Sequence, residues 1–228
     1  MSHHTNIVRI KAVANALKDL KAKIVFVGGA TVSLYPDRPV FEVRPTDDID
    51  VIIEILNYTE RARLEEKLRL IGFSHDTESG VICRYQIQGI TVDIMPTNDS
   101  SIGFTNKWYP DGFKTAVDYK IDETNLIKIM SAPYFIATKL EAHKGRGRND
   151  GRTSQDFEDI VYVLENRGVI WSELDNAKQS VQKYLQAEFK TLLENPNFFE
   201  WIDAHVERSD QPATSHIIDR IKKFVTRF

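Results

Sequence analysis

Two aspartates stand at the beginning of an apolar strand, and this pairing limits how the chain can fold more than any other feature. Asp48 and Asp50 flank Ile49, and the apolar residues 51–53 follow. Residues two apart on a strand point to the same side, so both carboxylates project from one face. Carboxylates this close repel unless a cation neutralises them or one takes up a proton. The pair therefore predicts a metal site at the start of a buried strand, or else an acidic turn that includes Asp47.

A third carboxylate fits the same site. Asp93 lies in the middle of the apolar run 90–95. An acid in that position is costly to bury without a partner. If this strand lies beside the Asp48 strand, Asp93 completes a cluster of three carboxylates, whose hard oxygens suit Mg²⁺ or Mn²⁺. Such a cluster can hold two divalent ions for in-line attack at phosphorus.

A pair of glycines ends the preceding apolar strand. Residues 23–27 are a run of β-formers, Gly28-Gly29 follows, and residues 30–34 predict a short helix. Bare backbone N–H groups at such a turn can approach a phosphate closely, although a glycine pair can also be an ordinary tight turn. No Gly-Lys-Ser/Thr follows, so this turn is not a P-loop.

The wider pattern divides the chain into two parts. We expect strands over 48–55, 81–87 and 90–95, further β-structure over 114–121 and 126–130, and helices over 7–20, 59–71, 134–143, 155–166, 171–193, 198–207 and 216–228. Gln88-Gly89 predicts a hairpin turn, and Thr59 and Ser154 are candidate N-caps. The predicted fold class is α+β. It has a small mixed β-sheet core flanked by helices in residues 1–130 and a helical C-terminal region in residues 131–228.

Composition narrows the class of protein. The formal net charge of the 228 residues is -3, which argues against a globally basic nucleic-acid binder but allows a local basic patch. Cys83 is the only cysteine, so no intrachain disulfide can form. The sequence contains neither a run of about 20 apolar residues nor a secretory signal, so we expect no membrane association and a cytoplasmic location.

The order of these motifs resembles the DNA polymerase β-like nucleotidyltransferase superfamily. A strand, Gly28-Gly29 and a short helix are followed by the Asp48-x-Asp50 strand and then by a distant Asp93 strand. The resemblance implies that the glycine turn holds the phosphates of the incoming nucleotide and that the paired acids bind metal. It also implies that Asp93 completes the metal site and helps to activate the attacking hydroxyl. Many members have Gly-Ser at the turn, where this chain has Gly29.

Within the superfamily, the chain is most similar to the AbiEii-type toxin nucleotidyltransferases. Segment 44–50 is similar to their R-x-S/T-x-D-I-D signature, and Lys139 and Asp156 match their lysine helix and the following acidic helix. The resemblance implies that Lys139 supports nucleotide binding and that Asp156 is needed for activity. Asp159 is an alternative to Asp156, because residues 144–153 lengthen the spacing. The expected nucleotide-binding residues are Gly28, Gly29, Thr31, Ser33, Arg44 and Lys139.

The resemblance implies metal-dependent transfer of a nucleoside monophosphate from an NTP to a hydroxyl, with an RNA or tRNA 3′ end as acceptor and an antitoxin as a protein partner. A glycine-rich loop can contact RNA through four cations, or can simply be solvated: Lys144, Arg146, Arg148 and Arg152. Two other functions remain open. One is an aminoglycoside-type small-molecule nucleotidyltransferase, and the other is a non-catalytic, antitoxin-like nucleotide-binding module.

Three further side chains have both a functional and a structural interpretation. Trp108 and Tyr109 can stack a base or pack in the interior. His143 can carry a proton or be an ordinary surface histidine at a helix end. Lys139 itself lies on a mostly apolar helix, where it can pair with an acid, reach a triphosphate or extend to solvent.

Overall fold

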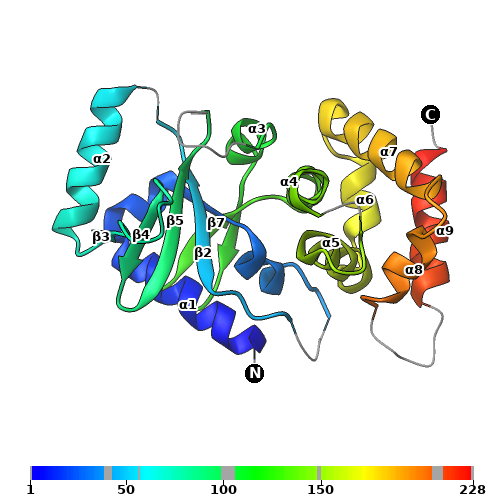
Figure 1. Ribbon diagram of the computed structural model, residues 1–228, viewed down its shortest axis with the longest axis horizontal. Helices are drawn as coiled ribbons and strands as arrows, with labels where there is room; N and C mark the ends of the chain where they lie inside the picture. The colour runs from blue at the N-terminus through cyan, green and yellow to red at the C-terminus, as the bar shows by residue number, and fades with distance from the viewer. Residues whose placement is uncertain are drawn as a thin grey trace. The chain divides into compact units, whose positions relative to one another are not determined.

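The structure is a computed structural model that describes residues 2–38, 43–55, 57–98, 106–147, 150–206 and 213–226. The chain separates into two compact units, which are described one at a time (Figure 1). The sheet unit comprises Met1–Leu34 and Phe41–Ser131, and the helical unit comprises Tyr35–Val40 and Ala132–Phe228.

Among the described residues, seven strands form one mixed sheet in the order β3-β4-β5-β2-β1-β7-β6. The strands are β1 (Ile24–Val27), β2 (Asp48–Ile53), β3 (Ser74–His75), β4 (Arg84–Ile87), β5 (Ile90–Pro96), β6 (Val117–Lys120) and β7 (Leu126–Ile129). β2 is parallel to β5 and β1 is parallel to β7, whereas β1 and β2 are antiparallel. β1 is buried along its whole length, which explains its continuous apolar sequence.

The predicted hairpin between β4 and β5 is confirmed. Ile87 pairs with Ile90 in the antiparallel register. Gln88 has φ 52° and Gly89 has φ 75°, so both central residues are in the left-handed region that a type I′ turn requires. This turn fixes which residues of β4 and β5 lie opposite each other.

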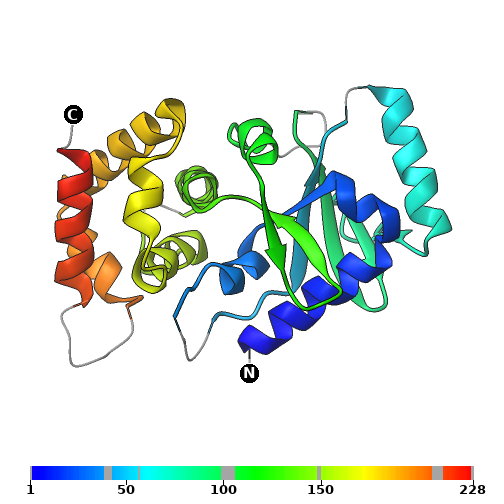
Figure 2. The ribbon, with the colours of Figure 1, turned by 180° about the vertical axis from the view of Figure 1, so that it is seen from behind.

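Helices cover the sheet unit: α1 (Ser2–Ala16), α2 (Tyr58–Leu70), α3 (Tyr109–Lys114) and the 3₁₀ segments η1 (Lys18–Lys23) and η2 (Gly29–Leu34). α1 packs against η2, β2 and β5 through buried residues that include Ile10 and Val13, and Figure 2 shows it lying across the sheet. The helix predicted over residues 7–20 begins earlier and ends at Ala16, because Lys18 adopts a positive φ of 50° and starts η1.

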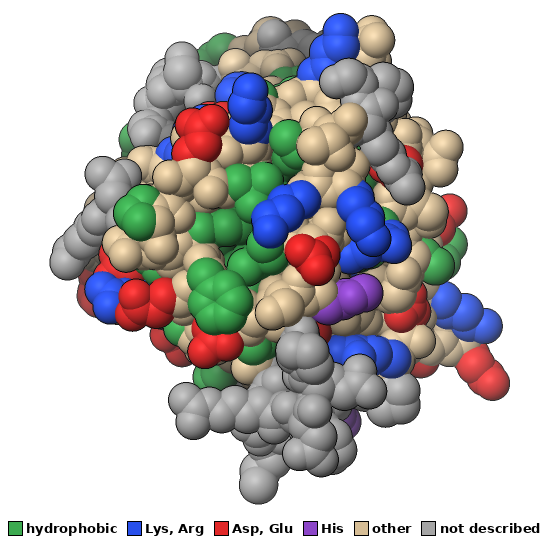
Figure 3. All heavy atoms as spheres, turned by 90° about the vertical axis from the view of Figure 1, so that its right-hand side faces the viewer, with side chains coloured by type: hydrophobic (Ala, Val, Ile, Leu, Met, Phe, Trp, Pro, Cys, Tyr) green, Lys and Arg blue, Asp and Glu red, His purple; other side chains and the backbone are tan. Residues whose placement is uncertain are grey.

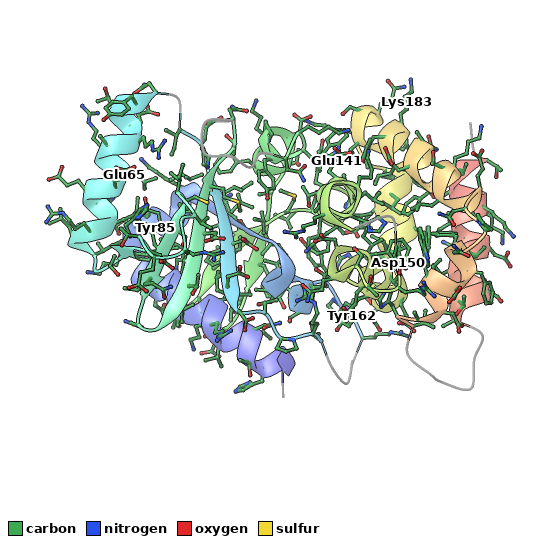
Figure 4. All side chains as sticks on the ribbon, viewed as in Figure 1. Glu65, Tyr85, Glu141, Asp150, Tyr162 and Lys183 are labelled. Carbon is green, nitrogen blue, oxygen red and sulfur yellow. The ribbon has the colours of Figure 1, made fainter. Side chains whose placement is uncertain are left out.

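α2 is largely exposed, and Leu68 is its only buried residue. Figure 4 shows Glu65 on this helix and Tyr85 on β4. The helix begins earlier than predicted, because the side chain of Asn57 accepts a hydrogen bond from the Glu60 N–H at 3.0 Å and acts as the N-cap in place of Thr59.

The helical unit contains α4 (Ala132–Arg146), α5 (Gln155–Asn166), α6 (Ile170–Asp175), α7 (Gln179–Leu193), α8 (Phe198–Asp203) and α9 (Ala213–Val225). α4 packs against α5, α6 and α7, and α9 packs against α5, α7 and α8. The single helix predicted over residues 171–193 is wrong. It breaks between α6 and α7, where Nε2 of Gln182 donates to the carbonyl oxygen of Asp175 at 2.7 Å and satisfies the end of α6.

A segment from early in the chain belongs to the helical unit. The Asp37 carboxylate accepts hydrogen bonds from the N–H groups of Gly168 at 2.9 Å and Val169 at 3.3 Å, and Nη1 of Arg167 donates to the Tyr35 carbonyl at 2.8 Å. The Tyr35 ring lies 4.5 Å from the ring of Phe135. Within the described part of the chain, no helix is both long and apolar enough to cross a membrane.

Candidate active site

Three aspartates of the sheet unit meet where β2 lies beside β5. The parallel register places Asp50 opposite Asp93, and Asp48 lies two residues before Asp50 on the same face. One carboxylate oxygen from each residue lies within 4.8 Å of the others. Asp93 is buried, whereas Asp48 and Asp50 are half-buried. These residues, called here the acidic cluster, offer three hard oxygen ligands to a divalent cation.

The glycine turn contacts the acidic cluster directly. Val27 pairs with Asp50, so Gly28 follows at the end of β1. Gly28 has a φ of +73°, and a Cβ added to it would lie 1.9 Å from Oδ2 of Asp50. A side chain is therefore excluded both by the backbone conformation and by space. The turn leaves bare backbone beside the Asp50 carboxylate.

The hydroxyl groups after the turn are engaged inside the protein. Oγ1 of Thr31 donates to the Gly28 carbonyl oxygen at 2.8 Å, and Oγ of Ser33 accepts from Nδ2 of Asn6 at 3.2 Å. Both hydroxyl-bearing side chains are buried. In this structure these two groups hold the turn and η2 in place.

Asn6 also ties the segment before β2 to α1. Nδ2 of Asn6 donates to the Arg44 carbonyl oxygen at 3.1 Å, and the Thr46 N–H donates to Oδ1 of Asn6 at 3.4 Å. Oγ1 of Thr46 donates to the carbonyl oxygen of Asp48 at 3.3 Å. The Arg44-x-Thr46 part of the signature therefore fixes how the chain enters β2, and thereby where Asp48 stands.

Arg84 is a charged residue of this site that the sequence interpretation missed. It lies at the start of β4, opposite Asp93 in the antiparallel register. Nε donates to Oδ1 of Asp93 and Nη2 donates to Oδ2, both at 2.8 Å, and Nη2 lies 3.5 Å from Oδ2 of Asp48. The hydrogen bonds to Asp93 raise the pKa of Arg84, so the guanidinium is a permanent cation. Counting equally outward from the Gln88-Gly89 turn would have paired Arg84 with Asp93.

A second charged cluster lies inside the helical unit. Nζ of Lys139 on α4 lies 2.6 Å from Oδ2 of Asp159 and 3.1 Å from Oδ1 of Asp156, both on α5. Nε and Nη2 of Arg146 donate to the two oxygens of Asp156 at 2.7 and 2.8 Å. Lys139, Asp156 and Asp159 are all buried. The lysine therefore pairs with both of the acids that the sequence offered as alternatives.

Lys139, Arg146, Asp156 and Asp159 are called here the Lys139 cluster. The pKa shifts of Lys139 and Asp156 show that the members favour one another's charged form. Burial alone would lower the pKa of Lys139, but the charges of Asp159 and Asp156 raise it above its usual value. Burial likewise opposes ionisation of Asp156, but the hydrogen bonds from Arg146 and the charge of Lys139 lower its pKa. A pocket of about 340 Å³ opens beside Arg146, Ser154 and Asp156.

Comparison with known proteins decides the family. Residues 12–224 match the family described as nucleotidyl transferase AbiEii toxin, Type IV TA system. The chain belongs to the AbiEii nucleotidyltransferase family. The predicted family is thereby confirmed, and the protein is a nucleotidyltransferase enzyme. A search of curated proteins found no match.

Solved structures with a similar fold include the antibiotic-resistance factor ANT(2'')-Ia. Its solution structure has a TM-score of 0.52 and 15% sequence identity, with 85% of this chain and 97% of that chain covered. A crystal structure of ANT(2'')-Ia in complex with adenylyl-2''-tobramycin has a TM-score of 0.48 and 13% identity, with 81% and 99% covered. The first likeness concerns the fold alone, and it agrees with the predicted α+β class, which is confirmed.

The cations of the glycine-rich segment 144–153 form ion pairs with acidic side chains wherever the structure describes them. Lys144 and Arg146 belong to α4 and not to the predicted loop, and Arg146 is held by Asp156. Nζ of Lys144 donates to Glu141 at 2.7 Å and to Glu188 at 2.8 Å. Figure 4 shows Glu141 on α4.

The far end of the same segment is paired in a similar way. Arg152 donates to Asp150 at 3.2 Å and to Glu200 at 2.9 Å. Figure 3 shows one face of the helical unit, where Lys and Arg side chains and Asp and Glu side chains are scattered among hydrophobic and other residues. Arg148, the fourth cation of the predicted loop, lies outside the described residues. The described surface of this AbiEii protein is therefore mixed in charge there.

Burial decides between the two interpretations of Trp108 and Tyr109, and it corrects the interpretation of His143. Trp108 and Tyr109 are buried at the start of α3, which favours packing over base stacking. His143 is also buried, so it is not a surface histidine. Its Nδ1 lies 2.8 Å from Oγ of Ser154, and its ring packs against Phe157. Burial lowers the pKa of His143. Because Ser154 caps α5, its contact with His143 gives the histidine a structural role at the N-terminal end of that helix.

Proposed function

We propose that this protein transfers a nucleoside monophosphate from an NTP to a hydroxyl group of RNA, with a tRNA-like 3′ end as the acceptor. The observation that carries the proposal is the acidic cluster, in which oxygens of Asp48, Asp50 and Asp93 lie within 4.8 Å of one another. We propose that the sheet-rich residues 1–130 form the catalytic domain and that the helical residues 131–228 support it.

The acidic cluster fits a divalent cation. Its donors are all carboxylate oxygens, the ligands that Mg²⁺ and Mn²⁺ prefer. Arg84 supplies one positive charge to the three carboxylates, so the cluster keeps a net negative charge that attracts a divalent cation. Asp48, Asp50 and Asp93 would hold Mg²⁺ or Mn²⁺. A bound ion would neutralise charge on the triphosphate and promote ionisation of the acceptor hydroxyl.

The residues of the sheet unit position the reacting groups. The bare backbone of Gly28 and Gly29 approaches the triphosphate beside Asp50. The acceptor oxygen attacks the α-phosphorus, an oxygen–phosphorus bond forms, and the bond to the β-phosphate oxygen breaks with release of pyrophosphate. Asp93 helps to take up the proton of the acceptor hydroxyl. Because Thr31 and Ser33 already bond within the protein, we assign them to support of the turn that receives the nucleotide.

We also propose that residues outside the acidic cluster contribute to nucleotide binding. Lys139 and Asp156 support nucleotide binding and activity, as the family resemblance implies. Asp156 lines the pocket beside Arg146, and Lys139 is ion-paired with Asp156. Arg44 contributes to nucleotide binding from the segment that enters β2.

The family description supports an antitoxin as a partner, since it names a toxin of a Type IV TA system. RNA as the acceptor follows from the resemblance to the AbiEii-type toxins. We also propose that the protein acts in the cytoplasm, where NTPs and RNA occur. The fold likeness to ANT(2'')-Ia favours one alternative, a small-molecule hydroxyl acceptor such as an aminoglycoside. The membership of the chain in a nucleotidyltransferase family argues against a non-catalytic module.

The acceptor profile tests this proposal. Wild-type protein and Asp48→Ala would be incubated with Mg²⁺, each labelled NTP in turn, and either total RNA or a panel of aminoglycosides. We expect label in RNA with wild type alone. Label in the aminoglycosides alone would establish the small-molecule alternative, and equal labelling by Asp48→Ala would contradict the assigned site.

A further inference from the structure

We propose that the guanidinium of Arg84 is the resident counter-cation of the acidic cluster and that it competes with a divalent cation for Asp93 and Asp48. The inference rests on the proposed function, because it concerns the same three carboxylates. Arg84 is then a positioning residue that sets the metal affinity of the site and does not itself act on the substrate.

Arg84 engages oxygens that a metal would need, through hydrogen bonds to Asp93 and an ion pair with Asp48. Nη2 lies 2.8 Å from Oδ2 of Asp93 and 3.5 Å from Oδ2 of Asp48, so it stands between two carboxylates of the cluster. Mg²⁺ binds oxygen ligands at about 2.0–2.1 Å. A divalent cation held by these carboxylates would lie near the guanidinium, and the two positive charges would repel. Metal binding therefore requires the Nη2 group to withdraw.

The backbone of β4 keeps Arg84 at this position. The Gln88-Gly89 turn fixes the register, and the Arg84 carbonyl oxygen accepts a hydrogen bond from Asp76 N at 2.9 Å. The side chain is 25% exposed, so the guanidinium has access to solvent. Because arginine has a long flexible stem, its charged end can leave Asp93 while the strand stays in place.

The charges of the group predict which form of the metal displaces Arg84 more readily. Three carboxylates and one guanidinium leave the group with a formal charge of about -2, which still attracts a divalent cation. A free ion offers the displaced guanidinium no new partner. An ion that arrives with a triphosphate brings phosphate oxygens, which arginine binds well. Arg84 should therefore weaken binding of free metal more than binding of a metal–nucleotide complex.

The test is calorimetric titration of Mn²⁺ into the full chain. In Arg84→Gln we expect the Kd for Mn²⁺ alone to fall by about tenfold or more, with a smaller change when a non-hydrolysable NTP analogue is present. Arg61→Gln is the matched control, because Arg61 pairs with Glu65 on the exposed helix α2 at 3.1 Å. An unchanged or raised Kd in Arg84→Gln would overturn the competition.

A second variant keeps the test valid if Arg84→Gln does not fold. Arg84→Lys retains the charge but cannot form two parallel hydrogen bonds with Asp93, so we expect an intermediate Kd, and a Kd equal to or above that of wild type overturns the proposal. Asp50→Asn separates this inference from the proposed function. If wild type binds Mn²⁺ no better than Asp50→Asn, the metal site itself fails. If wild type binds better but Arg84→Gln matches wild type, only the competition fails.

Discussion

Gly28 lies so close to the Asp50 carboxylate that no side chain fits between them. An added Cβ would stand 1.9 Å from Oδ2 of Asp50, and the backbone already has a φ of +73°. The glycine turn and the acidic cluster are therefore parts of one site. A change at the turn must displace either the backbone of β1 or the carboxylate of β2.

Gly28→Ala is expected to reduce transfer activity by at least about 100-fold, since misplacing a reacting group by about 1 Å can cost that much. Gly89→Ala is the matched control, because Gly89 has a φ of +75° and nothing within 4 Å of an added Cβ. Both variants bear the backbone strain of about 1–2 kcal/mol. Urea unfolding should show at least this loss of stability in both variants, with a larger loss in Gly28→Ala because of the clash with Asp50, and initial rates should show loss of activity in Gly28→Ala alone. Equal activity of the two variants would contradict a functional contact with Asp50.

Lys139→Met should strongly destabilise the helical unit. The change leaves the carboxylates of Asp156 and Asp159 buried with less compensating charge, and breaking a buried ion pair typically costs about 3–5 kcal/mol. Lys128→Met is the control, because its pair with Asp118 is exposed and spans 3.5 Å. We expect that variant to lose no more than about 1 kcal/mol. Comparable unfolding free energies for the two variants would contradict the structural importance of the Lys139 cluster.

The Lys139 cluster should also make the free energy of unfolding depend on pH in the acidic range. The folded-state pKa of Asp156 is lowered, so its contribution is fully present above the unfolded pKa of about 3.9 and is lost as the pH falls through the folded pKa. The difference in unfolding free energy between wild type and Asp156→Asn should therefore be constant from about pH 7 to pH 5 and should shrink below about pH 4. A difference that grows on acidification would show that Asp156 is not stabilised as a carboxylate.

The acidic cluster and most elements could be predicted because they depend on local patterns. Alternation along a strand put Asp48 and Asp50 on one face, and the isolated acid in residues 90–95 required a partner. Ser154 was predicted as an N-cap from its position before residues 155–166, and its side chain does accept from the Phe157 N–H at 3.3 Å. These features need only a few neighbouring residues to be recognised.

The other features depend on register and packing, which a local pattern does not carry. Arg84 became part of the site only when the hairpin register placed it opposite Asp93. Lys139 had two candidate acids in sequence, and the packing of α4 against α5 brought both to it. The break between α6 and α7 follows from a hydrogen bond by Gln182, in the first turn of the next helix.

Neutralising the paired cations of the helical unit tests whether RNA uses that surface. Lys144→Gln with Arg152→Gln should raise the KM for RNA several-fold. The same change should reduce the slope of log affinity against log salt by about 0.7 for each RNA phosphate that the protein no longer neutralises. Lys222→Gln with Lys223→Gln on α9 is a control for the same change in net charge. An unchanged salt slope would mean that Lys144 and Arg152 serve only their ion pairs within the protein.

The central claim is that the acidic cluster performs metal-dependent nucleotide transfer, and single-turnover transfer by Asp50→Asn tests it most directly. Asp118→Asn is the matched control, because Asp118 is an exposed acid on β6 of the same sheet. With Mn²⁺, labelled NTP and RNA, we predict a rate at least about 1,000-fold below wild type for Asp50→Asn, equivalent to about 4 kcal/mol, and a wild-type rate for Asp118→Asn. A wild-type rate in Asp50→Asn, with its thermal unfolding unchanged, would contradict the account.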